Sequence, residues 1–448
     1  STSRRRATRS SDAVQTLGRA PRLTRRNLLA SLGAACLPWP ALAARQSVVL
    51  RPAALSTRIA GRRLDMLGFN GTIPGPEIRV RQGDQVDIRL ENGLDDGALV
   101  HWHGLRVPNR MDGVNVLTQD VVIPGRSHDY RFALPDAGTY WYHSHYLSYD
   151  QVSRGLFGAF VVEERDPPEV DHDITVQLFD MMIDEEGRYD DSFDPAQFAT
   201  AGKIGNVATA FVSRDSIRQG DRLRLRCINP SIDRIYELRL SGVAGNIVAL
   251  DGMPLPAPRP LAPIILAPGQ RCDVIADVTG PVRLTDTYGG TSVALGEIAM
   301  EGNRTPRRSA IPSLPANAMP APGPVDAHVD LVMQGGAGGR DHDGFGTWAL
   351  NDVSGLPRRP LVDVRRGATV RMTLRNATAF PHVMHLHGHH FHELDAEGAS
   401  GAYRDSTLVG AGAARDILCV LDNPGSWMLH CHMLSHQTDG MATWVRVR

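Results

Sequence analysis

The sequence predicts an all-β protein made of three consecutive Greek-key β-barrel or β-sandwich domains. Short runs alternate between apolar and polar residues, and frequent glycine and proline separate them, as expected for half-buried strands joined by turns. One such pattern occurs three times in the same order, which indicates three copies of one domain. The sequence shows neither a long helical period nor an alternation of strands with helices.

The repeat consists of two elements. The first is Arg-x-Gly, then apolar/polar alternation, then Asn, and it occurs at residues 78–92, 215–229 and 362–376. The second is a glycine four residues before an aspartate, at Gly125, Gly269 and Gly412. Because both elements recur in order, we predict domains at 44–165, 166–302 and 325–448, with a proline-rich linker at 303–324.

Length and charge exclude several classes of protein. The chain has 448 residues, 42% of them hydrophobic, which is ordinary for a soluble globular protein of roughly three domains at about 150 residues each. The formal net charge is −1, so the sequence has no electrostatic footprint for binding nucleic acid. Lys203 is the only lysine, and Schiff-base or lysine-base chemistry therefore has a single candidate.

Residues 1–43 resemble a targeting segment rather than part of the fold. Arg25 and Arg26 precede an apolar run at 28–37, and Ala41-Leu42-Ala43 fits a cleavage site. We interpret the segment as a twin-arginine export signal, which predicts export machinery as a partner and a periplasmic location. The apolar run is too short to span a bilayer, so no stable membrane anchor is expected, although Cys36 leaves lipidation as an alternative.

Four cysteines follow the predicted signal. In an oxidising compartment Cys227 and Cys272 could form a disulfide, and buried free thiols are the alternative for these two and for Cys419. Cys431 differs because it lies between two histidines.

Ten of the 17 histidines fall in four short clusters, and the repeat explains where they lie. His101-Trp-His103 and His385-Leu-His387 occupy equivalent places in the first and third domains. The pairs His143-Ser-His145 and His430-Cys-His432 also match each other, near the ends of those domains. The second domain has no histidine at either place, so we predict that the outer two domains carry a site and the middle one does not.

The spacing of these histidines predicts a metal cluster. Residues i and i+2 of a strand point to the same face, so each His-x-His presents two imidazoles together. Four pairs give eight imidazoles, which is too many for one ion and suits a cluster of about three metals. Imidazole suits copper, zinc, iron and nickel. The remaining candidates His382, Cys431, His436 and Met441 form the ligand set of a blue-copper site, in which methionine is the weak axial ligand. Because Cys431 lies between His430 and His432, it should point to the opposite face.

These motifs resemble those of the multicopper oxidases, a family of three cupredoxin domains that includes laccases, bilirubin oxidases and cuprous or ferrous oxidases. The resemblance covers the whole chain after the signal. It implies that the chain takes single electrons from a small reductant at a type 1 copper and reduces O₂ to water at a cluster, with about four copper ions per chain. The expected protein is a monomer.

Carried over residue by residue, the resemblance implies three kinds of copper site. The type 1 copper would be bound by His382, Cys431, His436 and Met441. The type 2 copper would be bound by His101 and His385. The type 3 pair would be bound by His103, His143, His145, His387, His430 and His432.

Reduction of O₂ needs a carboxylate near the cluster to supply protons. Asp112 matches an acidic residue that has this role in the family. Its alternative is an ordinary Asp-Gly turn residue. Gln437 stands where some bacterial relatives have a glutamate, so a second relay there is doubtful. The other histidines are expected to be bystanders: His128, His172, His328, His342, His389, His390 and His392.

The substrate is the open question. Met441 as axial ligand implies an easily oxidised donor, and we predict laccase-like oxidation of phenols. Cuprous or ferrous oxidation for metal tolerance is the alternative, with the acidic stretch around 180–186 as a modest candidate for metal entry. Copper nitrite reductase, a copper-sequestering protein and a non-catalytic cupredoxin protein are the more distant rivals.

Overall fold

The structure is a computed structural model that describes residues 45–214, 216–305, 309–338 and 348–448. The described residues belong to one compact unit, Ala44–Arg448. The predicted export signal at 1–43, with Arg25, Arg26 and Cys36, lies outside them, as does His342. Over the described ranges, no helix is long and apolar enough to cross a membrane.

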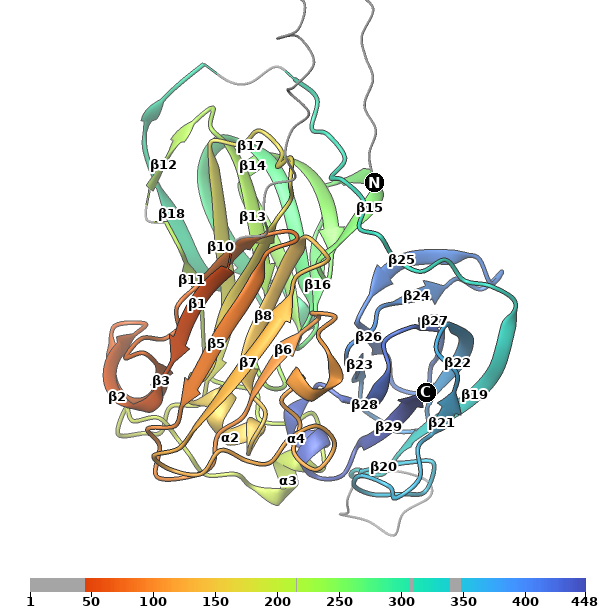
Figure 1. The fold of residues 1–448 in the computed structure, drawn as a ribbon. Coiled ribbons are helices and arrows are strands. Elements are labelled where there is room, and N and C mark those ends of the chain that lie inside the picture. The colour runs from red at the N-terminus through yellow and green to blue at the C-terminus, as the bar shows by residue number, and fades with distance from the viewer. Residues whose placement is uncertain (1–44, 215, 306–308, 339–347) are drawn as a thin grey trace, which may run out of the picture. The chain divides into compact units, whose positions relative to one another are not determined.

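The first repeat forms two small sheets and a hairpin (Figure 1). The three-stranded sheet has the order β1 (Arg45–Leu50), β5 (Gln85–Glu91), β7 (Ser127–Ala133). The four-stranded sheet has the order β4 (Ile78–Arg81), β9 (Phe157–Glu163), β8 (Gly138–Ser144), β6 (Val100–His103). The hairpin pairs β2 (Pro52–Ile59) with β3 (Arg62–Phe69). Ile88 of β5 and Phe160 of β9 belong to one buried core, so the two sheets pack face to face.

The middle repeat forms a nine-stranded sheet. Its main path is β11 (Val207–Val212), β10 (His172–Met181), β13 (Arg222–Ile228), β17 (Arg271–Asp286), β14 (Tyr236–Leu250), β15 (Met253–Pro260). Off this path lie β12 (Ser216–Gln219), β16 (Ile264–Leu266) and β18 (Val293–Asn303). Cys227 and Cys272 are direct partners across β13 and β17, and both are buried free thiols. The structure therefore has free thiols at Cys227 and Cys272 and not the disulfide, in line with the second of the two alternatives.

The last repeat again has two sheets. The six-stranded sheet has the order β20 (Ala349–Leu350), β19 (Val325–Gln334), β22 (Ala368–Asn376), β27 (Ala414–Leu421), β24 (Phe391–Leu394), β25 (Ser400–Arg404). The five-stranded sheet has the order β21 (Val362–Val364), β29 (Ala442–Val447), β28 (Gly425–Cys431), β23 (His382–Leu386), β26 (Ser406–Val409). Their apolar faces share one core, which includes Met372 and Leu429.

The three repeats share one strand topology. In each, the strand made by the first sequence element pairs in parallel with the strand that opens the repeat: β1 with β5, β10 with β13, and β19 with β22. It also pairs antiparallel with the strand that follows the second element's glycine: β5 with β7, β13 with β17, and β22 with β27. The predicted all-β fold is confirmed, and the exact domain limits stay a prediction.

Short helices lie beside the sheets. They are α2 (Ser148–Ser153), α3 (Pro195–Phe198), α4 (Leu434–Thr438) and the 3₁₀ turns η1 (Asn109–Met111) and η2 (Tyr288–Gly290). Asp194 caps α3 by accepting a hydrogen bond from the backbone N–H of Ala196 at 2.8 Å. Both α2 and α3 contact α4, which carries His436.

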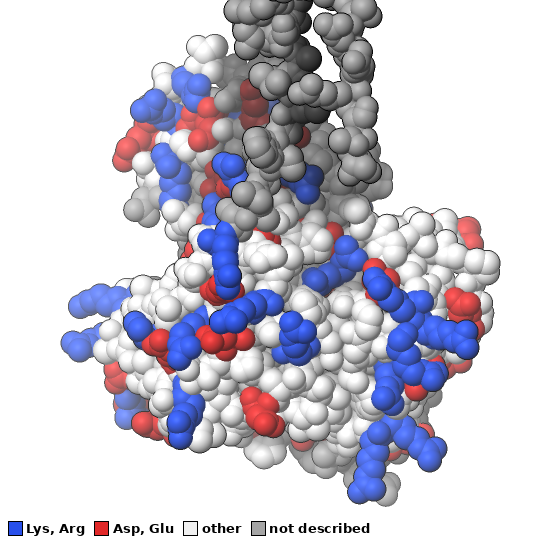
Figure 2. All heavy atoms as spheres, in the orientation of Figure 1, with Lys and Arg blue, Asp and Glu red and all other residues white. Residues whose placement is uncertain are grey.

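Figure 2 shows one face of the molecule, on which acidic side chains accompany many of the basic ones and several basic side chains gather at the right of the view. The formal net charge of the whole sequence is −1.

Candidate metal centre

Two pairs of antiparallel strands position the eight paired histidines. In the first repeat, β6 and β8 place His101 directly opposite His143. In the last repeat, β23 and β28 place His385 directly opposite His430. The strand period then points the second histidine of each pair to the same side. All eight side chains are buried.

The structure brings these histidines together in three groups, the first two of which share His103. In each group the possible ligand atoms lie within 4.8 Å of one another. The groups are His101, His103 and His385; His103, His143 and His432; and His145, His387 and His430. Each group combines residues from the first and last repeats, and no described residue of the middle repeat joins them.

Backbone and carboxylate oxygens fix which ring nitrogen faces inward. Five imidazoles use Nδ1 for an outer hydrogen bond of 2.8 to 2.9 Å, which leaves Nε2 for a metal: His101, His143, His385, His387 and His430. His103 is reversed, because its Nε2 lies 3.2 Å from Asp405 Oδ1 and its Nδ1 has no partner. Such outer partners are typical of metal-ligating histidines.

Unpaired buried nitrogens test whether a metal fits. Both ring nitrogens of His432, Nε2 of His143 and Nδ1 of His103 are buried without a hydrogen-bond partner. Buried polar atoms are normally paired, so these orphans are explained if they bind an ion. Burial, followed by the neighbouring imidazoles, holds the pKa of His143 and His432 well below 6.5. The rings are therefore neutral, which is the form that binds metal.

Asp112 lies where the two halves of the cluster meet. Its Oδ2 accepts a hydrogen bond from His387 Nδ1 at 2.9 Å, and its backbone oxygen accepts one from His101 Nδ1 at 2.9 Å. Its Oδ1 has no hydrogen-bond partner and lies 3.3 Å from His101 Nδ1. Asp112, which directly follows η1, thus contacts one histidine from each outer repeat. A residue that only formed a turn would not need these contacts.

A second group consists of His382, Cys431 and His436, with Cys431 on the other face of β28; we call it the mononuclear group because these donors could hold one ion. Cys431 Sγ is 3.7 Å from His382 Nδ1 and 3.8 Å from His436 Nδ1, and all three side chains are buried. Burial raises the pKa of the Cys431 thiol to about 12. Because the neutral thiol is favoured there, a bound cation is needed to form the thiolate ligand.

The backbone around this group places Met441 beside it. The Cys431 N–H donates to the Met441 carbonyl at 3.0 Å, and the Met441 N–H donates to the His436 carbonyl at 2.9 Å. Met441 is fully buried and shares the hydrophobic core with Cys431. The donor set is thus two imidazoles, a thiol and a nearby thioether, which suits copper.

Comparison with known proteins agrees with this donor chemistry. Family models described as multicopper oxidase match residues 55–167 and 324–448. The solved structure of Lac15, from a marine microbial metagenome, is 45% identical with a TM-score of 0.78, and the match covers 90% of this chain and 100% of that one.

The chain belongs to the multicopper oxidase family. It is laccase-like, with cupredoxin domains. A solved multicopper oxidase from Pseudomonas thermotolerans is 30% identical with a TM-score of 0.82, over 91% of this chain and 100% of that one. The multicopper oxidase MmcO of Mycobacterium tuberculosis is 28% identical over 89% of this chain and 86% of that protein.

Several residues of this multicopper oxidase contact the histidines of the mononuclear group and carry no sequence signal. The Trp348 ring lies 4.3 Å from the His436 ring and 4.9 Å from the His382 ring, between centroids. Thr200 of the middle repeat accepts a hydrogen bond from His436 Nε2 at 2.7 Å. Thr378 Oγ1 lies 2.8 Å from His382 Nε2. None of these belongs to a motif, so only the tertiary contacts find them.

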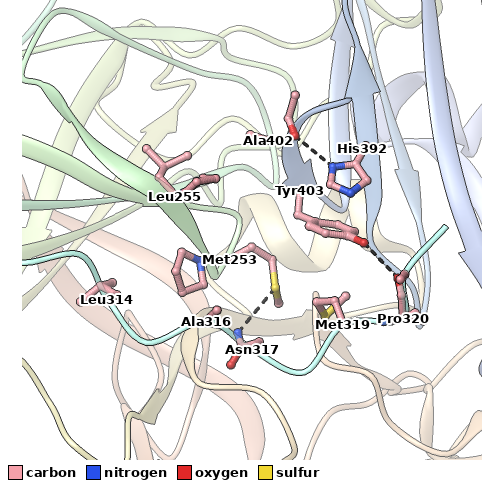
Figure 3. A pocket seen from close by; sticks show the side chains of 14 residues that line it. Met253, Leu255, Leu314, Ala316, Asn317, Met319, Pro320, His392, Ala402 and Tyr403 are labelled. Carbon is pink, nitrogen blue, oxygen red and sulfur yellow. Dashed lines mark hydrogen bonds between the residues drawn. The ribbon is translucent and has the colours of Figure 1, made fainter. Parts of the chain in front are cut away.

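Of the predicted bystander histidines, those within the described residues lie outside the metal groups, and His342 is not among the described residues. His390 Nε2 lies 3.3 Å from the Asp251 carbonyl, and His389 Nε2 accepts a hydrogen bond from the Asn423 N–H at 3.2 Å. His392 lines a separate cleft of about 370 Å³ and donates from Nδ1 to the Gly401 carbonyl at 2.9 Å (Figure 3). His172 pairs with Asp221 at 3.1 Å.

Proposed function

We propose that this multicopper oxidase couples four one-electron oxidations of a small phenolic reductant to the reduction of O₂ to water. The observation that carries the proposal is the position of Cys431 at the end of β28: it belongs to the group with His382 and His436, while its neighbours His430 and His432 belong to the three-histidine groups. Bound copper would supply one-electron redox chemistry at both places. The assignments we propose are type 1 at His382, Cys431, His436 and Met441; type 2 at His101 and His385; and type 3 at His103, His143, His145, His387, His430 and His432.

The chain contributes a short covalent connection between these sites. Cys431 belongs to the mononuclear group, while its neighbours His430 and His432 belong to the cluster groups. Asp112 would hold and deliver protons at its Oδ1, the carboxylate oxygen without a hydrogen-bond partner. We further propose that the protein is exported through the twin-arginine route to the periplasm and works there as a monomer.

The proposal of a phenolic reductant is supported by a cleft beside the mononuclear group. The cleft measures about 220 Å³, and its apolar lining includes Ile235, Pro381 and Met433. Pro381 precedes the ligand His382, and Met433 follows Cys431 by two residues. Such a lining suits an aromatic ring better than a hydrated cation.

The carboxylates of this cleft are already engaged within the protein. Asp286 Oδ2 accepts from Arg234 Nη2 at 3.0 Å, and Asp233 Oδ1 accepts from Ser435 Oγ at 2.9 Å. In the acidic stretch considered for metal entry, Asp184 accepts from Arg188 Nε at 2.9 Å and Glu186 pairs with the same arginine at 3.1 Å. The engaged carboxylates of the cleft favour the phenol over the cuprous or ferrous alternative.

The decisive experiment measures copper content, the visible spectrum and O₂ uptake. We expect about four copper ions per chain and a blue band from the thiolate site. Cys431→Ser should lose the blue band and all turnover and keep the cluster copper, because Cys431 belongs to the mononuclear group alone. A blue band that persists in this variant would refute the type 1 assignment.

Steady-state kinetics then separate the two substrate classes. We expect kcat/KM for 2,6-dimethoxyphenol to exceed kcat/KM for Cu(I). A Cu(I) value far above the phenol value would make the protein a cuprous oxidase. Copper binding without O₂ uptake would instead point to a sequestering protein.

A further inference from the structure

The middle repeat supplies a buried ion pair to the histidine cluster. Arg271, the first residue of β17, donates from Nη1 to Asp405 Oδ1 at 2.8 Å and from Nη2 to Asp405 Oδ2 at 2.6 Å. Both side chains are fully buried. This two-pronged contact fixes the plane of the carboxylate as well as its position.

Asp405 in turn holds one histidine from each outer repeat. Its Oδ1 accepts from His103 Nε2 at 3.2 Å, and its backbone oxygen accepts from His385 Nδ1 at 2.9 Å. The contact to His103 accounts for the reversed ring of that residue, whose unpaired Nδ1 is left to face the cluster. Ser406 Oγ adds a hydrogen bond to Asp405 Oδ1 at 2.8 Å.

Arg271 is itself anchored on several sides. Its Nε donates to the Thr139 carbonyl of β8 at 3.1 Å, and its Nη1 donates to the Gly269 carbonyl at 3.1 Å. Its backbone N–H donates to Asp251 Oδ1 at 2.8 Å. A buried ion pair adds little net stability, because desolvation offsets the attraction. The presence of this ion pair is therefore better explained by the position that it imposes on the Asp405 carboxylate than by added stability.

Two glycines leave the space that this arrangement needs. A Cβ at Gly104, the residue after His103, would collide with Arg271 Nη2 and Asp405 Oδ2. A Cβ at Gly269 would lie 2.8 Å from His103 Cε1 and 3.1 Å from the His432 ring. The turn before β17 thus packs directly against the histidine cluster, although none of its residues belongs to the cluster.

We propose that the Arg271–Asp405 pair is a positioning element of the copper cluster. Arg271 fixes Asp405, and Asp405 fixes the ring orientation of His103 and the place of His385. The ligand-free middle repeat thereby sets the copper affinity of a cluster built by the other two. This inference rests on the proposed copper sites.

The test compares Arg271→Gln with the wild-type full chain. Copper is assigned by type from electron paramagnetic resonance and absorption, and its affinity is measured by chelator competition. We expect about 10- to 100-fold weaker binding at the cluster, the usual effect of losing an outer partner of a metal ligand. The blue band should keep its position and intensity. Arg224→Gln is the matched control: it removes a buried arginine of the same sheet, which pairs with Glu164 and Asp273 away from the cluster.

Arg271→Lys keeps the proposal testable if Arg271→Gln does not fold. Lysine keeps the charge and loses the two-pronged contact, so cluster affinity should fall between the wild type and Arg271→Gln, with an unchanged blue band. Wild-type cluster affinity in either variant would overturn the proposal, as would equal losses at both copper sites or the same cluster loss in Arg224→Gln. A wild-type chain that fails to take up copper would contradict the proposed function instead.

Discussion

Asp112 shows how one side chain can combine two tasks. Its Oδ2 orients His387, while its Oδ1 has no hydrogen-bond partner inside the protein. A carboxylate with one fixed and one unpaired oxygen can hold a ligand in place and still carry a proton. The amide of asparagine can keep the first task and cannot perform the second.

We therefore expect Asp112→Asn to slow O₂ reduction by about 10²-fold or more without changing copper content. Stopped-flow reoxidation of the reduced protein measures the rate. Anaerobic reduction of the blue band by the phenol serves as the control and should keep its wild-type rate. An unchanged reoxidation rate would return Asp112 to a purely structural role.

Asp233 predicts a pH dependence of stability. Burial raises its pKa to about 7, against the opposing hydrogen bonds from the Lys203 N–H and Ser435 and with a further increase from Asp180. Because the folded pKa lies above the ordinary 3.8, its contribution to stability is complete below about pH 4 and is lost as the pH rises through about 7. Asp233→Asn, which stays neutral, should abolish this dependence.

The measurement is thermal unfolding of the copper-free protein at pH 5 and pH 8. Relative to wild type, the Tm of Asp233→Asn should be higher at pH 8 than at pH 5. An equal difference at the two pH values would show that Asp233 is already ionised at pH 5.

At the scale of elements, tight turns place the ligands as much as the strands do. The turn after η1 contains Asp112 and Gly113. The φ of Gly113 is 78°, which lies in the left-handed region. A Cβ there would collide with the Val100 carbonyl, one residue before the ligand His101. Because the colliding atom belongs to the backbone, no side chain could move aside to relieve the contact. Glycine is therefore required at this position.

Gly113→Ala should therefore destabilise the protein by more than the left-handed backbone alone explains. Gly125→Ala is the matched control, because its φ is 73° and a Cβ there meets nothing within 4 Å. We expect about 1–2 kcal/mol for the control, the cost of left-handed backbone, and a clearly larger loss for Gly113→Ala. Denaturant unfolding of both variants measures this, and equal losses would contradict the collision.

For the whole molecule, the cluster joins the first and last repeats. Each of its three groups takes histidines from both ends of the described chain. Copper that binds only the folded arrangement stabilises it by mass action. The middle repeat adds Arg271, which pairs with Asp405 beside the cluster, and Thr200, which contacts His436 of the mononuclear group.

Removing copper should therefore lower the Tm, and adding it back should restore the Tm in a concentration-dependent way. Differential scanning calorimetry before and after chelation measures the shift. Cys431→Ser should keep most of the stabilisation, because the cluster spans the two repeats without it. A Tm that is independent of copper would show that the ions do not hold these repeats together.

The sequence by itself determines the fold class, the threefold repeat and the clustering of the paired histidines. These follow from local patterns, since strand alternation and His-x-His spacing fix which side chains share a face. The opposite orientation of Cys431 follows from the same period. Copper as the metal follows from the donor types.

Only the tertiary structure decides how the ligands are held. Asp405, Trp348 and Thr200 contact histidines far away in the sequence, and Arg271 reaches them through Asp405. None of these four residues belongs to a repeated motif. The reversed ring of His103 is set by Asp405 from another repeat. Local periodicity carries no information about such contacts, because they arise when separately folded sheets pack against one another.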